Sequence, residues 1–266
     1  MALDTQDKLV AMLASGIIDP VYKASVANTA AGQYATLWRS AGVPTAGAIP
    51  GAAATCTNAL AGALALPTLS ALRGYVAKLG VGGATIGTWV LFDRLAHMGG
   101  LSGTVTTAQT ANVSLATAAA DGRCSANGSD VLWFVEVYTD MGSTGVNATV
   151  AYTDQSDGAQ TAAAIALGAT PRAARLYQII PNAGTSIKQV NTVTLSATTG
   201  TAGSFGVTAR KRLCSVGQLV ANVYPPGDFA TIGAPEFKQT SCLEIVDICS
   251  TTSTGILQGE IVLGVA

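Results

Sequence analysis

The single histidine of the chain, His97, is the one side chain in the sequence suited to act as a general base near neutral pH. It lies in FDRLAHMGG, four residues after Asp93, and Ser102 follows in the glycine-rich GGLSG. A hydrolase would use His97 as base, Asp93 to orient it and a serine as nucleophile. No G-x-S-x-G pattern is present, however, and a spacing of four brings side chains together on a helix, whereas this segment reads as a strand. The sequence therefore favours a structural or hydrogen-bonding role for His97, and a protein that is not an enzyme.

Acidic side chains could support cation binding or paired-carboxylate hydrolysis. Asp154 and Asp157, in the turn DQSDG, could touch a cation, but the turn lacks the ligand number of a calcium loop. Glycoside hydrolysis needs two carboxylates at a set separation, and no spacing selects a pair. The acids available for it are Glu136, Asp140, Glu236, Glu244, Asp247 and Glu260. The glycine runs GVGGATIG and GGLSG match neither phosphate-binding fingerprint. We therefore expect no catalytic, cofactor-binding or metal-binding residues, and no cofactor.

The cysteines carry no recognisable metal or disulfide pattern. They are Cys56, Cys124, Cys214, Cys242 and Cys249. Their number is odd and none forms a C-x-x-C pair, which argues against a zinc site and a disulfide framework. We expect them to be small buried hydrophobes in a reducing compartment.

Charge is scarce along the whole chain. Charged residues make up 11% of the 266 residues, against about 25% in ordinary soluble domains, and the formal net charge is −1. Sparse surface charge favours association, so we expect neighbouring copies to cover much of the surface. The alternative is an unusual monomer whose surface is Thr, Ser, Asn and Gln. The densest basic cluster, residues 210–212, would alternate between two faces of a strand, so nucleic-acid binding is not expected.

One stretch of 33 residues, 40–72, contains no ionised side chain, and its centre reads GAIPGAAATCTNALAGALALP. A membrane-spanning helix needs roughly 20 strongly apolar residues. Here alanine and glycine dominate, and Pro50 and Pro67 would interrupt a helix. We therefore expect irregular chain that lies against another surface. The N-terminus carries two acids and one lysine before any apolar run, so it does not read as a secretory signal.

The spacing of apolar residues predicts a helical beginning and a β-rich remainder. Residues 3–16 show a helical stripe, 23–38 a weaker one, and 69–79 a further helix candidate; Asp19-Pro20 is expected to break the chain. From Ile86 onward, β-branched and aromatic residues with turn signals every 8–12 residues indicate strands. The expected strands are 88–95, 131–138, 146–153, 161–167, 174–180, 190–197, 204–213, 243–249 and 256–265. We expect a mainly β protein, with an N-terminal arm and helical or irregular segment (1–83) and an antiparallel β-sandwich or jelly-roll-like domain (84–266).

Glu136 and Arg210 stand out as charges inside otherwise apolar or Thr-rich expected strands. Two interpretations are open for them. Each could form an ion pair between subunits, or each could face solvent on an edge strand, since one face of such strands is normally polar.

Several long segments together resemble a family of tailed-bacteriophage virion proteins. The resemblance covers most of the chain. The segments are LWRSAGVPTAGAIPGAAATCTNALAGALAL, TWVLFDRLAHMGGLSGTVTTAQTANVSL, WFVEVYTDMGSTGVNATVAYTDQ, LGATPRAARLYQIIP, VNTVTLSATTGTAGSFGVTARKRL and CSTTSTGILQGEIVLG.

The resemblance implies a non-enzymatic virion structural protein, foremost a capsid cement or decoration protein that stabilises the shell as an oligomer. Its partners would be copies of itself, with a trimer suited to quasi-threefold positions, and the major capsid protein; neither nucleic acid nor membrane is expected as a partner. It would reside in the virion, assembled in the bacterial host cytoplasm. A charge-free arm lying on a neighbouring subunit or on the shell would need no ions to be desolvated.

Two alternatives remain open beside the capsid role. One is a tail, collar or neck component of the virion. The other is a receptor-binding or glycan-binding β-sandwich, for which exposed aromatic side chains would be needed. The aromatic candidates are Trp89, Trp133, Tyr138, Tyr152 and Tyr224, of which the first four fall in expected strands and favour the core.

Overall fold

The computed structural model describes residues 3–69 and 73–265. The protein is mainly β, with 47% strand and 7% helix, which confirms the expected class. The chain forms two compact units. Unit 1 comprises Met1–Gly47, Thr57–Asp93 and Leu213–Ala266, and unit 2 comprises Ala48–Cys56 and Arg94–Arg212. The division expected at residue 83 falls inside unit 1, because segments from both ends of the chain build that unit.

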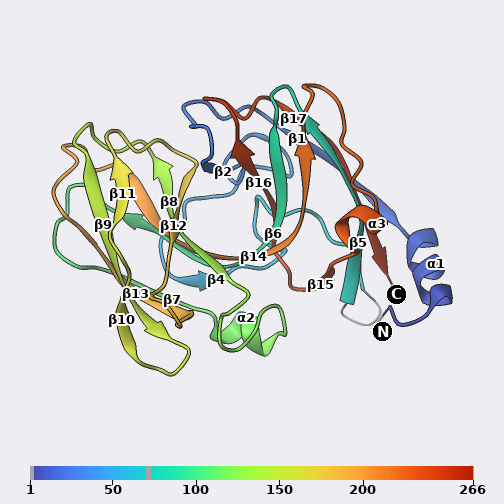
Figure 1. The fold of residues 1–266 in the computed structure, drawn as a ribbon, viewed down its shortest axis with the longest axis horizontal. Helices are drawn as coiled ribbons and strands as arrows, with labels where there is room; N and C mark the ends of the chain where they lie inside the picture. Colours follow the sequence, from blue (N-terminus) through green and yellow to red (C-terminus); the bar gives the residue numbers. More distant parts are fainter. Residues whose placement is uncertain (1–2, 70–72, 266) are drawn as a thin grey trace. The chain divides into compact units, whose positions relative to one another are not determined.

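Unit 1 contains a five-stranded antiparallel sheet with the order β15-β5-β17-β1-β3, of which Figure 1 shows β5, β17 and β1 side by side. Its strands are β15 (Glu236–Lys238), β5 (Arg73–Gly83), β17 (Leu257–Val265), β1 (Ile17–Lys23) and β3 (Gly42–Val43). Val21, Leu79, Val81 and Ile261 are buried in the core of the unit. The opposite face of the sheet is the outer one.

Unit 1 has a second group of strands. It consists of β2 (Tyr34–Thr36), β16 (Leu243–Cys249) and the first half of β6 (Gly87–Leu101), with β16 paired to both neighbours. Trp89, Leu91 and Leu243 are fully buried and join the same core as the five-stranded sheet. The two groups of strands in unit 1 therefore share one hydrophobic core.

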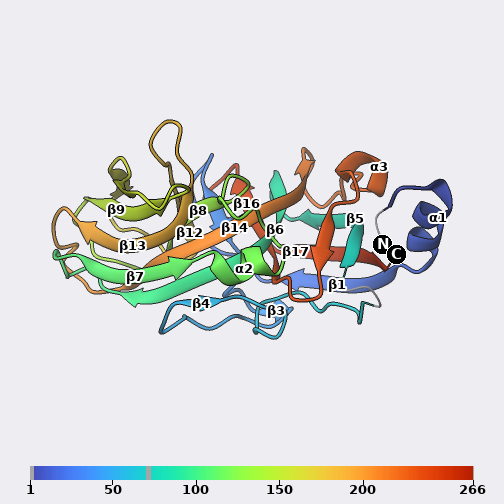
Figure 2. The ribbon, with the colours of Figure 1, turned by 90° about the horizontal axis from the view of Figure 1, so that it is seen from below.

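Helix α1 (Gln6–Ala14) covers one end of the outer face of the five-stranded sheet (Figures 1 and 2). The side chain of Thr5 caps its N-terminus, and buried Met12 packs on Tyr75 and Ala77 of β5. At its C-terminus, Ser15 Oγ donates to the carbonyl oxygen of Val265 at 2.8 Å. The helix expected over residues 3–16 is thus confirmed, and its apolar stripe is buried against the sheet.

The other two helix predictions in this part of the chain are wrong. Residues 73–79 belong to strand β5, while 70–72 lie outside the described residues. Residues 23–38 are irregular apart from short strands, β2 among them. Asp19-Pro20, expected as a break, lies inside β1, where Pro20 is opposite Glu260 of β17. Strand β3 reaches only Tyr22 and Lys23, so at Pro20 the other side of β1 is an edge, where a missing N–H is tolerated.

Part of the charge-free stretch packs against an indole of the same chain. A Cβ on Gly47 would lie 2.1 Å from Trp38 Nε1, and one on Gly62 would lie 2.9 Å from Trp38 Cδ2. Trp38 is buried, and the nearby Leu64 donates its N–H to the carbonyl oxygen of Leu243 at 2.9 Å. Small side chains are therefore needed at these positions because the backbone runs directly along the ring. Within unit 1, the surface that this segment covers is the chain's own.

Unit 2 contains a sheet with the order β10-β9-β13-β7, and Figure 2 shows β7 and β13 side by side. Its strands are β10 (Ala159–Thr161), β9 (Val146–Asp154), β13 (Ile187–Leu195) and β7 (Gln109–Ser114). Strand β11 (Ile165–Gly168) also pairs with β9, so part of the strand expected over 161–167 lies beside the strand expected over 146–153. The clean alternation of β9 buries every second side chain, as the sequence pattern predicts.

A second group of strands completes unit 2. Strand β8 (Leu132–Thr139) lies between β12 (Arg175–Ile179) and the first part of β14 (Ser204–Gln218), and β4 (Ala54–Thr55) pairs with the second half of β6. A short helix, α2 (Ala116–Ala120), follows β7. Val135 of β8, Val150 of β9 and Val207 of β14 are fully buried in one core. Both groups of strands in unit 2 thus contribute to a single hydrophobic interior.

Candidate functional site: a groove between two tyrosines

The three side chains of the hydrolase alternative do not form a triad. The Asp93 carboxylate accepts hydrogen bonds from Ser241 Oγ at 2.7 Å and from the backbone N–H of Cys242 at 2.9 Å. His97 is buried, and its Nδ1 accepts from Arg94 Nε at 3.2 Å.

The proposed nucleophile is occupied as well. The hydroxyl of Ser102 lies 2.9 Å from Thr104 Oγ1 and accepts from the Thr104 backbone N–H, so it closes a turn. The three groups of the hydrolase alternative are thus engaged in separate local interactions.

The turn that could have held a cation is satisfied internally. Asp154 Oδ1 accepts from the N–H groups of Ser156 and Gly158, and Lys188 Nζ pairs with Asp157 at 2.6 Å. Across residues 3–69 and 73–265, no group of three or more His, Cys, Asp or Glu side chains is placed to hold a metal ion. All five cysteines are buried, as expected, and none forms a disulfide in this part of the chain.

The acids considered for paired-carboxylate chemistry are also dispersed among separate partners. Asp140 pairs with Arg172 at 2.7 Å, Glu260 pairs with Lys78 at 2.7 Å, and Glu236 pairs with Lys238.

No helix in the described ranges is long and apolar enough to cross a membrane.

Glu136 and Arg210 are neither exposed nor directed at another subunit, so both interpretations drawn from the sequence are wrong. In unit 2, Glu136 Oε2 lies 2.7 Å from a terminal nitrogen of Arg210 and 2.9 Å from one of Arg94, and all three side chains are fully buried. Arg94 also donates to the hydroxyl of buried Tyr138 at 2.9 Å. Arg210 lies 5.5 Å from the centre of the Phe134 ring.

In this buried network, the negative charge of Glu136 is compensated by the positive charges of Arg94 and Arg210. Burial alone would raise the pKa of Glu136, but the guanidinium groups of Arg94 and Arg210 outweigh it and keep that pKa below its usual value. Burial, reinforced by the Glu136 charge, raises the pKa of Tyr138 well above its usual value, which keeps the phenol protonated. Glu136 Oε1 has no hydrogen-bond partner among the described residues. Because its three charged side chains are fully buried and pair with one another, the network is best understood as internal structure.

Two buried ionisable side chains in unit 1 are compensated less completely. No donor among the described residues reaches either oxygen of Asp247 with hydrogen-bond geometry. Burial raises the pKa of Asp247 to about 7, although the nearby Cys249 thiol and Thr88 backbone act against it. Burial likewise lowers the pKa of Lys23 to about 8, against the opposing charge of Glu244.

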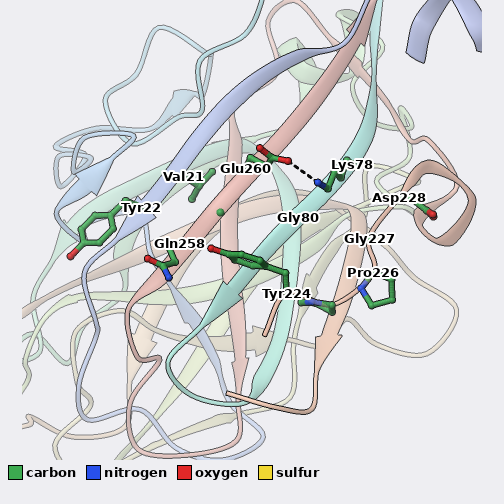
Figure 3. A pocket seen from close by; sticks show the side chains of 12 residues that line it. Val21, Tyr22, Lys78, Gly80, Tyr224, Pro226, Gly227, Asp228, Gln258 and Glu260 are labelled. Carbon is green, nitrogen blue, oxygen red and sulfur yellow. Dashed lines mark hydrogen bonds and ion pairs between the residues drawn. The ribbon is translucent and has the colours of Figure 1, made fainter. Parts of the chain in front are cut away.

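Of the aromatic side chains considered for ligand binding, only one is accessible. Trp89, Trp133, Tyr138 and Tyr152 are buried, in keeping with their expected place in the core. Tyr224 is 53% exposed. It follows β14 and lines a groove of about 800 Å³ on the outer face of the five-stranded sheet, at the end that α1 leaves uncovered (Figure 3).

The register of three strands builds the floor and walls of this groove. Tyr22 of β1 is opposite Gln258 of β17, and Gln258 is opposite Gly82 of β5. The ring of Tyr224 takes the space above Gly82, because a Cβ there would lie 2.9 Å from Tyr224 Cδ1. Tyr22 and Tyr224 therefore flank Gln258 along one row across the sheet, with Tyr22 46% exposed (Figure 3).

The next part of the groove is polar. Lys78 Nζ and Glu260 Oε1 lie 2.7 Å apart, and Gly80 leaves room for the lysine chain to reach across (Figure 3). Gly259, with φ of +145°, brings its backbone against the carbonyl oxygen of Gly80, where a Cβ would lie 2.2 Å away. Asp228 also lines the groove, but its Oδ1 caps helix α3 (Phe229–Ile232) by accepting from the Thr231 N–H.

Tyr22 was missed from the sequence because β1 was not expected to be a strand. The alternation of Ile18, Pro20 and Tyr22 with Asp19 and Val21 could have indicated a strand. The Asp19-Pro20 dipeptide instead indicates a break in the chain. The groove itself depends on the pairing of strands that are remote in sequence.

A second feature adjoins the groove: an apolar loop over residues 219–224. Leu219 is 89% exposed and Val220 60% exposed. The buried Gln218 amide fixes the start of the loop: its Oε1 accepts from Gly83 N and Trp89 Nε1, and its Nε2 donates to the carbonyl oxygens of Gly83 and Val220. Three of these hydrogen bonds thus attach the start of the loop to Gly83 and Trp89 and the fourth reaches Val220, while Leu219 and Val220 stay exposed at the surface.

Comparison with known proteins identifies no relative. No protein-family model, curated protein or solved structure matches the chain.

Proposed function

We propose that this chain is a non-enzymatic structural protein of a tailed-phage virion, foremost a capsid cement or decoration protein. It would bind the major capsid protein and copies of itself, as a trimer at quasi-threefold positions, and reside in the virion. The single observation that carries an assembly role is the anchored apolar loop over residues 219–224. The resemblance of the long segments quoted above supplies the virion context.

The exposed apolar side chains gather on unit 1. They are Val10, Ile17, Ile18, Tyr22, Val43, Ile86, Leu219, Val220, Val223, Tyr224 and Ile256, whereas in the described part of unit 2 they are Val105 and Ile180. Apolar surface gains free energy when a partner covers it, and a chain with 11% charged residues has few ions to desolvate there. An apolar loop that is already fixed also loses little conformational entropy on binding.

The finer architecture belongs to the same proposal. We assign the shared cores of the two units to an antiparallel β-sandwich or jelly-roll-like arrangement, in which two groups of strands pack face to face.

The test is co-sedimentation of the purified chain with expanded capsid shells that lack it, followed by a heating challenge. We expect saturable binding and a raised disruption temperature for the shell. The double variant Leu219→Asp, Val220→Asp should weaken binding by at least tenfold, because two charges would have to be desolvated. Ile180→Asp is the matched control on unit 2, since Ile180 is 56% exposed, and it should bind normally.

Other outcomes separate the alternatives. Rings or tubes formed by the chain alone, without shell binding, would move it to the tail, collar or neck. A monomer that neither binds shells nor self-associates would contradict the assembly role. Normal shell binding by the Leu219→Asp, Val220→Asp variant would remove the loop from the interface.

A further inference from the structure

The groove on the outer face of the five-stranded sheet presents two aromatic walls and a flat glycine floor. Its volume, about 800 Å³, lies within the range of small-molecule sites. Adjacent strands are about 4.8 Å apart, so β1 lies about 10 Å from β5, and the row Tyr22–Gln258–Gly82 spans that distance. A ligand lying along this row would be elongated and flat on the side that faces the sheet.

The groove continues past the row. A smaller depression of about 160 Å³ shares Tyr224 and Gln258 with it and is lined on the far side by Asn222 and Ile256. Because the Tyr224 ring rests on Gly82, a chain-like ligand would pass from one depression to the other beside that ring, over Gln258, and the Asn222 amide would offer a polar group at the distal end.

The polar groups of the groove suit hydroxyl groups better than ions. Among residues 3–69 and 73–265, no hydrogen bond is formed by the side-chain amide of Gln258 or by the hydroxyls of Tyr22 and Tyr224, so both donors and acceptors are available. Lys78 and Glu260 compensate each other's charge, and no other lysine or arginine is among the described residues that line the site. An anionic ligand would also meet Asp228, which is unfavourable.

The aromatic walls favour a ring-shaped ligand with an apolar face. The face of a tyrosine ring is electron-rich, and the C–H groups on one face of a pyranose carry partial positive charge, so the two stack. A proline-rich peptide also packs on exposed aromatic rings, but it needs apolar pockets between them. Between Tyr22 and Tyr224 lie Gln258 and bare glycine backbone instead.

From these observations we propose that the Tyr22–Tyr224 groove of unit 1 is a binding site for a neutral oligosaccharide. Tyr22 and Tyr224 stack on its sugar rings, and Gln258 and the Lys78–Glu260 pair hydrogen-bond its hydroxyl groups. The site goes beyond the assembly role, because it uses the sheet face and Tyr224 at the end of the 219–224 loop, whereas the assembly test addresses Leu219 and Val220, which do not line the groove.

The test is titration of the full chain with maltohexaose, cellohexaose and chitohexaose, followed by calorimetry and by NMR saturation transfer. We expect saturable binding of at least one of the three. Tyr22→Ala and Tyr224→Ala should each weaken it by about tenfold, as expected for the loss of one stacked ring, and Gln258→Ala should weaken it several-fold. Tyr224→Phe should retain most of the affinity. Leu219→Ala, adjacent but outside the groove, should bind normally.

Three results would overturn the proposal. The first is the absence of saturable binding by all three sugars at millimolar concentration. The second is binding that the Tyr22, Tyr224 and Gln258 variants, each folded by circular dichroism, leave unchanged. The third is decaproline binding more tightly than any sugar and competing with it, which would make the groove a peptide site.

The outcome is separable from that of the assembly test. The Leu219→Asp, Val220→Asp variant should lose shell binding and keep oligosaccharide binding, whereas Tyr22→Ala should do the reverse. Loss of both functions in both variants would contradict the separation of the two surfaces.

Discussion

Unit 1 and unit 2 are each built from antiparallel strands around a core of their own. They differ in where charged side chains are buried and where apolar side chains are exposed. In unit 2, Arg94, Glu136 and Arg210 lie fully inside and compensate one another. In unit 1, exposed apolar side chains and a groove lie on the surface, and the buried Asp247 lacks a hydrogen-bonding partner among the described residues.

The difference indicates that the buried charges of unit 2 select one packing of its own core, whereas the exposed apolar side chains of unit 1 are suited to binding a partner. A buried ionic network contributes little net stability but penalises alternative packings that would leave a charge unpaired. An exposed apolar surface costs free energy in water and is retained where a partner covers it. Unit 2 therefore has the features of a scaffold, and unit 1 those of a recognition element. Four predictions can break or sharpen this comparison.

The largest effect is expected in unit 2, from Glu136→Gln. Two guanidinium groups would remain buried without a counter-charge, which should lower the free energy of unfolding by about 3–5 kcal/mol. Urea denaturation measures the loss, and hydrogen exchange in peptides of β8 and β14 should locate it in unit 2. A change under 1 kcal/mol would show that the network is hydrated and not buried as described.

The second effect concerns pH and unit 1. The pKa of Asp247 is raised to about 7 by burial, so the folded state retains a proton that the unfolded chain loses near pH 4. This contribution to stability is complete below pH 4 and is lost as pH rises toward 7, by up to about 4 kcal/mol. Urea denaturation at pH 5 and pH 8 measures it.

Asp247→Asn is the matched variant, because an uncharged side chain of the same shape has no proton to lose. It should reduce the difference in stability between pH 5 and pH 8. An identical pH dependence in the variant and the natural protein would assign that dependence to other groups.

A third, smaller effect is expected in the charge-free stretch. Gly47→Ala would place a methyl group against Trp38, which should lower the free energy of unfolding by about 1–3 kcal/mol. Gly51→Ala, in the same stretch, meets open space and should change stability by no more than about 0.5 kcal/mol. Equal thermal unfolding midpoints for the two variants would show that the indole does not require the glycine.

The smallest effect is expected at the surface of unit 2. Asp140→Asn removes an exposed ion pair with Arg172 and should cost at most about 1 kcal/mol. Measured beside Glu136→Gln, it compares an exposed and a buried carboxylate of the same unit. A loss as large as that of Glu136→Gln would contradict the distinction between the two.

The sequence predicted those strands and the helix whose own residues show a clear pattern of apolar side chains. The alternation of 146–153, the aromatic run 131–138 and the helix over 3–16 were all recovered. The strand over 73–83 was not, because its glycines and its single lysine hide the alternation, and its stability comes from pairing with β17. The β1 strand was missed for a different reason, because its Asp-Pro dipeptide indicated a break in the chain. The proline is tolerated because the sheet leaves an edge at that position of β1.

The candidate site was predicted only at one position. Tyr224 was a candidate, while Tyr22 and Gln258 were not, since they come together only through the register of β1, β17 and β5. Glu136 and Arg210 were recognised as exceptional, but their burial and their shared partner Arg94 were not foreseeable, because partner choice depends on packing between strands far apart in sequence.

By itself, the sequence determined the β class, the scarcity of charge, the burial of the cysteines and the absence of a recognisable catalytic pattern. These follow from composition and from local periodicity, which act over a few residues. Only the tertiary structure decided which charges are buried together, which small residues face Trp38, and where two tyrosines form a groove. Such features depend on long-range pairing, and the free energy of pairing is set by surfaces that no local pattern encodes.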